Sequence, residues 1–225
     1  TNKQSAIVDF KEATIKGQAP DKGLYFPEVI PQVDKNLING IADFSNEEIA
    51  FRVIKPYVGN TIPEDKLFQI VSETVNFPIP LVKVNDTISS LELFHGPTLA
   101  FKDIGARFMS RCLGHFVGSG QAAVSVPTVT VLVATSGDTG GAVANGFYNV
   151  DGVNVVILYP SGKVSPVQEK QLTTLDKNIK ALEVEGTFDD CQQIVKQAFT
   201  DKDINDKLFL TSANSINVAR WLPQQ

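Results

Sequence analysis

A lysine at the start of a predicted helix is the residue in this sequence best placed to do chemistry. The run HGPT at residues 95–98 favours a turn, and apolar residues then recur with helical spacing around Lys102. These apolar residues are Phe101, Ile104, Phe108, Cys112 and Phe116. We expect a helix that begins at Phe101 or Lys102, with Asp103 in its first turn, where a carboxylate offsets the helix dipole.

The position of Lys102 favours a neutral amine. The unpaired N–H groups of a helix N-terminus disfavour a nearby positive charge. A neutral amine attacks carbonyl groups, which is what a lysine needs to hold an aldehyde as a Schiff base. The alternative is a surface lysine whose stem lies along the protein and whose ammonium stays in water. The apolar residues on both sides of Lys102 weaken this alternative without excluding it.

A glycine-rich loop, TSGDTGG at residues 135–141, follows a predicted buried strand. Glycine lets the backbone approach a ligand closely, and the helix that follows offers free N–H groups to a carboxylate or a phosphate. Ser136, Gly137 and Thr139 are therefore candidates for contacts with an anion. Asp138 conflicts with that interpretation unless its carboxylate faces another group, and the simpler alternative is that it caps the helix.

Two further loops carry cationic side chains. Lys163 lies in SGKV, which is not a phosphate-binding Walker loop because its first glycine is missing and Val164 replaces the hydroxyl residue. The run NSINVAR at residues 214–220 places Ser215 as a predicted N-cap, with Asn214 before it and Arg220 after it. A hydroxyl, N–H groups and a guanidinium suit a phosphate. The alternatives are an exposed lysine and a capped helix with an exposed arginine.

The elements that position these loops alternate between strand and helix. Strands are predicted at residues 128–134, 153–159, 178–186 and 207–213, and helices at 140–147, 167–175, 188–199 and from about 215. Ser165 is the predicted N-cap of the second of these helices, Pro166 its first residue and Gln168 the partner in a capping box. The alternation predicts an α/β fold, an open, mostly parallel sheet with helices on both faces, in which ligands bind beyond the carboxyl ends of the strands.

The first ninety residues have a different pattern. Helices are predicted at residues 45–58, with Ser45 and Glu48 in a capping box, and at 63–75. Short strands are predicted at residues 22–31, 81–86 and 91–94. We therefore expect a small, mainly helical domain over residues 1–90, packed on the sheet domain of residues 91–225.

Composition excludes several classes of function. The net charge of −5 provides no basic face, so nucleic acid is not an expected partner. No apolar run approaches the length of a membrane span, and the start lacks a signal-peptide pattern. The two cysteines, Cys112 and Cys191, lie on predicted helices, which favours reduced thiols in a cytoplasm and no metal site.

A dinucleotide site is disfavoured by two observations. The segment GDTGGAVANG does not match GxGxxG, and the second strand ends in Tyr159-Pro160, where an acidic residue would hold a ribose.

The segment LELFHGPTLAFKD at residues 91–103 resembles the cofactor-lysine segment of threonine synthases. The segments ATSGDTGGAVANGF, VVILYPSGKVSPVQEKQL, TSANSINVAR and DKGLYFP are also similar to that family, so the resemblance covers essentially the whole chain. It implies a pyridoxal phosphate enzyme of fold type II, with a three-layer αβα domain like that of tryptophan synthase β. The implied reaction converts O-phospho-L-homoserine and water into L-threonine and phosphate, the last step of threonine biosynthesis.

The resemblance also implies roles for individual residues. Lys102 would hold pyridoxal 5′-phosphate as a Schiff base and move protons during the reaction, while Asp138 would lie near the 3′ oxygen of the cofactor. The loop residues Ser136, Gly137 and Thr139 would bind the substrate carboxylate. The residues that would bind the substrate phosphate are Lys163, Asn214, Ser215 and Arg220.

The chain departs from the family in length, since it corresponds to roughly the N-terminal half of a full-length member. The other half carries the glycine-rich cup for the cofactor phosphate and the residue that faces the pyridine nitrogen. We therefore expect a truncated chain that binds the cofactor weakly and is inactive alone. Two other functions stay open: a threonine-synthase-like phospholyase acting on another phosphorylated amino acid, and a non-catalytic fragment.

Overall fold

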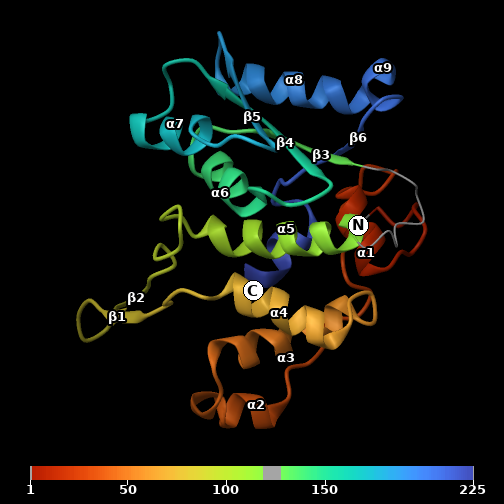
Figure 1. The fold of residues 1–225 in the computed structure, drawn as a ribbon. Coiled ribbons are helices and arrows are strands. Elements are labelled where there is room, and N and C mark those ends of the chain that lie inside the picture. The colour runs from red at the N-terminus through yellow and green to blue at the C-terminus, as the bar shows by residue number, and fades with distance from the viewer. Residues whose placement is uncertain (1, 119–127, 225) are drawn as a thin grey trace.

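A computed structural model describes residues 2–118 and 128–224 (Figure 1). The helices are α1 Phe10–Lys16, α2 Lys35–Asn39, α3 Asn46–Val58, α4 Glu64–Thr74, α5 Lys102–Gly118, α6 Asp138–Phe147, α7 Pro166–Thr173, α8 Phe188–Thr200, α9 Lys202–Asn205 and α10 Val218–Trp221, with 3-10 turns at Ile41–Asp43 and Leu222–Gln224. The strands are β1 Leu81–Lys83, β2 Ser89–Leu91, β3 Val129–Ala134, β4 Val153–Pro160, β5 Ile179–Val184 and β6 Phe209–Thr211. Among the described residues, no helix is both long and apolar enough to cross a membrane.

The four later strands form one parallel sheet in the order β5-β4-β3-β6. Successive side chains of a strand point to opposite faces of the sheet. Val131 and Val133 of β3 accordingly join the large core that also contains Phe147 of α6, whereas Leu132 packs with Cys191 of α8. Figure 1 shows α8 on one face of the sheet and α6 on the other. The predicted α/β fold with helices on both faces is confirmed.

Helix α5 occupies the centre of the molecule, between α4 and α6 (Figure 1). Its buried side chains include Phe108, Leu113 and Phe116, each at most 2% exposed. The same core takes in residues of α1, α3 and α4, so the N-terminal helices and the sheet share one apolar interior. The division of the chain into domains at residue 90 stays a prediction.

Local signals in the N-terminal part were mostly sufficient to predict its elements. The capping box of α3 forms as predicted, with Ser45 accepting from the N–H of Glu48 and Glu48 accepting from the N–H of Ser45. The two short strands β1 and β2 pair in antiparallel fashion, although β2 lies at residues 89–91, slightly before its predicted place.

Two expectations are wrong. Residues 22–31 form no strand, because Pro27 and Pro31 lack N–H groups for a ladder, and Phe26 instead stacks on Trp221 with ring centroids 5.6 Å apart. Phe101 is 51% exposed and therefore does not belong to the buried face of α5. The helix begins at Lys102, one of the two predicted starts.

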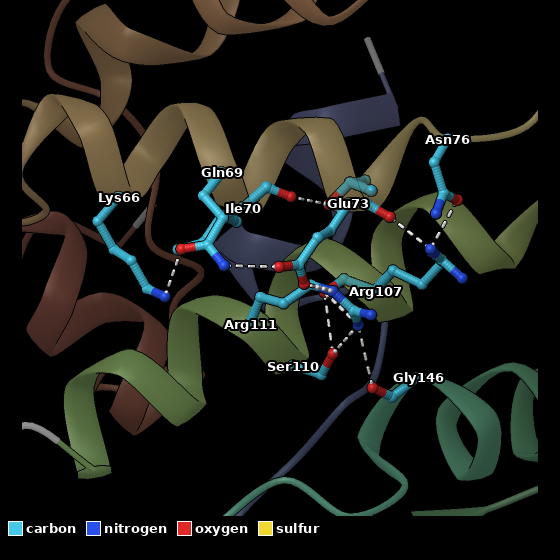
Figure 2. Close-up of polar contacts among 10 residues, drawn as sticks. Lys66, Gln69, Ile70, Glu73, Asn76, Arg107, Ser110, Arg111 and Gly146 are labelled. Carbon is cyan, nitrogen blue, oxygen red and sulfur yellow. Dashed lines mark hydrogen bonds and ion pairs between the residues drawn. The ribbon is translucent and has the colours of Figure 1, made fainter.

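Two arginines of α5 fasten α4 to the centre of the fold (Figure 2). Arg111 Nε lies 3.0 Å from Glu73 Oε2, and its Nη1 donates to the carbonyl of Gly146 on α6. Arg107 Nη2 donates to the carbonyl of Glu73 and to Asn76 Oδ1. Burial, followed by the nearby charge of Arg111, holds the pKa of Arg107 below its usual value.

We expect Arg111→Met to lower the free energy of unfolding by about 1–2 kcal/mol, because charged hydrogen bonds to α4 and α6 are lost at a partly exposed site. Urea denaturation followed by circular dichroism would measure this change. The matched control is Lys66→Met, at the exposed end of the same chain of contacts, for which a change below about 0.5 kcal/mol is expected. Equal losses in the two variants would show that Arg111 does not fasten the helices.

Both cysteines are unpaired and fully buried, Cys112 in α5 and Cys191 in α8. Burial raises the pKa of each thiol, so little thiolate is present at neutral pH. We expect Ellman's reagent to react slowly with the folded chain. After denaturation in guanidinium chloride, it should react rapidly with both thiols. Rapid reaction of the folded chain would contradict the packing of these two helices.

Candidate active site

The loop before α5 is held by the carboxylate of Asp103, and this contact fixes where Lys102 lies. Asp103 Oδ2 accepts from the N–H of Thr98 at 2.9 Å and Oδ1 accepts from its hydroxyl at 2.6 Å. Asp103 is 1% exposed. A side chain at Gly96 would meet Asp103 Oδ2 at 2.5 Å, so the loop passes too close for any residue but glycine. Asp103 therefore shapes the loop in addition to its position in the first helical turn.

The loop at the carboxyl end of β3 is shaped by the hydroxyl of Thr135. This oxygen accepts from the N–H groups of Gly137 and Gly140, at 3.0 and 2.8 Å, which folds the chain tightly into the start of α6. Gly137 has φ of 147°, a conformation that favours glycine. Ser136 and Asp138 are left exposed on the outer side of the turn, and Thr139 is half-buried.

Lys102 and Asp138 meet at this point. Lys102 Nζ lies 3.9 Å from Asp138 Oδ2, and the two side chains are 27% and 51% exposed. The starts of α5 and α6 are therefore adjacent, as expected from the resemblance, which placed both residues at one cofactor. The alternative that Asp138 merely caps α6 is wrong, because Gly137 is the N-cap and no side chain caps the helix.

Helix α7 contributes two glutamines to the same site. Gln168 Nε2 donates to Asp138 Oδ1, and Gln171 Nε2 lies 3.4 Å from the carbonyl of Thr98. The sequence predicts a capping role for Gln168 and carries no signal for Gln171. Ser165 is the N-cap as predicted, since its hydroxyl accepts from the N–H of Gln168.

Arg220 reaches α5 from the third loop. It is 2% exposed, and its Nη1 donates to the carbonyl of Ala213 at 2.6 Å, while its Nε has no hydrogen-bond partner among the described residues. A Cβ built at Gly105, which lies one turn after Lys102 in α5, would be 3.1 Å from Arg220 Nε. Burial lowers the pKa of Arg220 to about 10, so the guanidinium is still charged at neutral pH. The predicted exposed-arginine alternative is therefore wrong.

The predicted N-cap at Ser215 is also wrong. The helix begins at Val218 and its N-cap is Asn217, whose side chain accepts from the N–H of Ala219. Asn217 Nδ2 also donates to the carbonyl of Thr14, which ties the turn to α1. Ser215 is exposed and its hydroxyl donates to Asn214 Oδ1 at 3.1 Å.

Lys163 is exposed in the turn after β4. The pKa of Asp190 lies below its usual value mainly because the N–H and hydroxyl of Thr187 donate to that carboxylate, and to a smaller degree because of the charge on Lys163. Lys163 therefore lies toward the start of α8. The structure brings Lys102, Asp138 and Gln168 together with Arg220 one turn away, whereas no contact joins Lys163, Asn214 or Ser215 to Lys102 among the described residues.

The chemistry of this arrangement is that of an accessible primary amine beside a carboxylate. Such an amine can capture an aldehyde and can carry a proton. Within residues 2–118 and 128–224, no group of three or more His, Cys, Asp or Glu side chains could hold a metal ion.

Comparison with known proteins shows similarity to one family over nearly the whole chain. The family described as "Threonine synthase N terminus" matches residues 1–75. The threonine synthase of Haemophilus influenzae is 46% identical over 217 residues, which cover 96% of this chain and 49% of the relative. The yeast (Saccharomyces cerevisiae) threonine synthase is 40% identical over 96% of this chain and 45% of its own length.

Solved structures show the same relationship. The crystal structure of threonine synthase from Escherichia coli has a TM-score of 0.85 and 43% identity, covering 96% of this chain and 49% of that one. The structure of pyridoxal-phosphate-bound threonine synthase from Brucella melitensis has a TM-score of 0.89 and 38% identity, covering 98% and 48%. The chain thus spans about half the length of the relatives it matches.

The parallel sheet, with a lysine at the start of the central helix, has the fold of the pyridoxal phosphate enzymes of fold type II. Within this class, the chain corresponds in sequence and fold to the N-terminal half of the threonine synthases, which confirms the resemblance.

Proposed function

We propose that the protein carrying this chain is a threonine synthase, which converts O-phospho-L-homoserine and water into L-threonine and phosphate with pyridoxal 5′-phosphate. The observation that carries the proposal is the accessible amine of Lys102, 3.9 Å from Asp138 at the carboxyl edge of the sheet. It lies in a chain that is similar to threonine synthases over 96% of its length. The 225 residues alone are proposed to be inactive, because they span about half of those relatives.

The described residues fit the aldehyde end of pyridoxal phosphate. A primary amine that is 27% exposed can be reached by an aldehyde, and Asp138 at the start of α6 lies 3.9 Å from it. When bound, this cofactor supplies a ring that stores the electron pair left on carbon after a proton is removed. Lys102 would hold its aldehyde carbon, and Asp138 would lie beside the adjoining ring oxygen.

The remaining roles fall to side chains around Lys102. Once released by the incoming substrate amine, the Lys102 amine would move protons at Cα and Cβ of the substrate. Ser136, Gly137 and Thr139 would bind the substrate carboxylate at the start of α6. Arg220 would stabilise the departing phosphate, which its charge and its unpartnered Nε support. Lys163, Asn214 and Ser215 are proposed as further phosphate ligands from the neighbouring turns.

The test is an assay of the longest protein that carries this sequence, with pyridoxal phosphate and O-phospho-L-homoserine. Threonine and phosphate released in equal amounts would support the proposal. Phosphate without threonine would support the phospholyase alternative, and release of neither product would contradict both. A Lys102→Ala variant that retains all measurable properties would instead support a non-catalytic role.

We also propose a cytoplasmic location. The two cysteines are free thiols, which is compatible with a reducing compartment.

A further inference from the structure

Gln168 and Lys102 lie next to different oxygens of the Asp138 carboxylate. Gln168 Nε2 donates to Asp138 Oδ1, while Asp138 Oδ2 is the oxygen that faces Lys102 Nζ at 3.9 Å. That separation is an ion-pair distance and exceeds the reach of a hydrogen bond. Asp138 is therefore bound to a neutral amide, and only lies near the amine.

The side chain of Gln168 is itself fixed from two sides. The hydroxyl of Ser165 donates to Gln168 Oε1 at 3.0 Å, and the amide lies directly over Gly137, where a built side chain would meet it at 2.5 Å. In an ordinary capping box the glutamine side chain accepts from the backbone N–H of the N-cap residue. Here the oxygen of Gln168 accepts from the Ser165 hydroxyl, and its nitrogen donates to Asp138. Gln168 therefore contacts the start of α6 as well as the start of its own helix, α7.

We propose that Gln168 is a positioning residue that keeps Asp138 from forming a direct hydrogen-bonded ion pair with Lys102. Asp138 is 51% exposed and sits on an outer turn, so without this restraint its carboxylate would close on the nearest cation, which is Lys102. A direct ion pair stabilises the ammonium form and lowers the fraction of reactive neutral amine. Gln168 thereby leaves the amine of Lys102 available to react with an aldehyde. The benefit of this reactivity to the protein rests on the proposed function.

The test measures the reactivity of Lys102 in the 225-residue chain without cofactor. Reductive methylation with formaldehyde and a borane, followed by peptide mass spectrometry, gives the rate at Lys102 relative to that at Lys196, an exposed lysine of α8. For Gln168→Leu we expect this ratio to fall about threefold to fivefold, the range of a partly exposed ion pair. Gln168→Glu should lower it at least as much, because a second carboxylate repels Asp138 toward Lys102.

Asp138→Asn supplies the decisive comparison. In that background no carboxylate can pair with Lys102, so the further change Gln168→Leu should leave the methylation ratio unaltered. Thr173→Val, a change of the same helix at an exposed position, is the control for altered α7 stability and should leave the ratio at the wild-type value. Thermal unfolding of each variant shows whether it is folded.

An unchanged ratio in both Gln168 variants, or an equal fall with and without Asp138→Asn, would overturn the proposal. Uptake of pyridoxal phosphate by the longest protein that carries this sequence is measured separately. Failure of that protein to take up the cofactor, with the methylation pattern of the 225-residue chain as expected, would count against the proposed function and leave the role of Gln168 standing.

Discussion

A Lys102→Ala variant is expected to lose the pyridoxyl label that borohydride fixes on the wild-type chain. Lys102 presents a partly exposed amine at the start of α5, next to the loop that would face the cofactor. Borohydride reduces a C=N bond to a stable amine, so label accumulates even where binding is weak. The measurement is peptide mass spectrometry after exposure to less than one equivalent of pyridoxal phosphate, and we expect at least about a hundredfold less label in the variant peptide, as for loss of a covalent nucleophile.

The control for this experiment is Lys196→Ala, which removes an exposed lysine of α8, the helix on the other face of the sheet (Figure 1). Its labelling should match that of the wild-type chain, with the label on the peptide that contains Lys102. Label spread evenly over exposed lysines would show that position 102 has no special reactivity. The assignment of the site would then lose its chemical basis.

Features set by neighbours in sequence were predictable. The capping box of Ser45 and Glu48, the N-cap at Ser165 and the start of α5 near Lys102 depend on residues a few positions apart. The alternation of strands and helices likewise needed only periodicity and turn residues, and it yielded the parallel sheet. The family resemblance implied that Lys102 and Asp138 lie at one cofactor, and the structure brings the two side chains to 3.9 Å.

Features set by distant contacts were not predictable. Asn217 is the N-cap of α10 in place of Ser215, and its side chain bonds to Thr14, 203 residues earlier. Gln168 carries a capping signal in the sequence, yet its amide bonds to Asp138, 30 residues away. Arg220 reads as a surface cation and is buried, because α10 packs against Gly105 of α5. The spacing of residues carries no information about such pairings.

The packing at Gly105 leads to the second large effect. A Cβ at this position would meet the carbonyl oxygen of Arg220 at 2.5 Å and Arg220 Nε at 3.1 Å. The first contact is with backbone, so α10 would have to move. Overpacking of this kind costs about 1–3 kcal/mol and at times more, which exceeds the gain of at most about 1 kcal/mol that alanine brings to a helix. Gly105→Ala should therefore lower the free energy of unfolding, measured by urea denaturation.

Gly118→Ala in the same helix separates the overpacking cost from the helix-propensity gain, because no atom of the described residues lies within 4 Å of a Cβ built there. That variant should be as stable as the wild-type chain or slightly more stable. The difference between the two alanine variants then isolates the contact of α5 with α10, and we expect it to be about 1–3 kcal/mol, the cost of overpacking. If both variants unfold at the same urea concentration, α10 does not pack on α5 as described. Arg220 would then be free to leave the vicinity of Lys102, and its proposed role toward phosphate would fail with it.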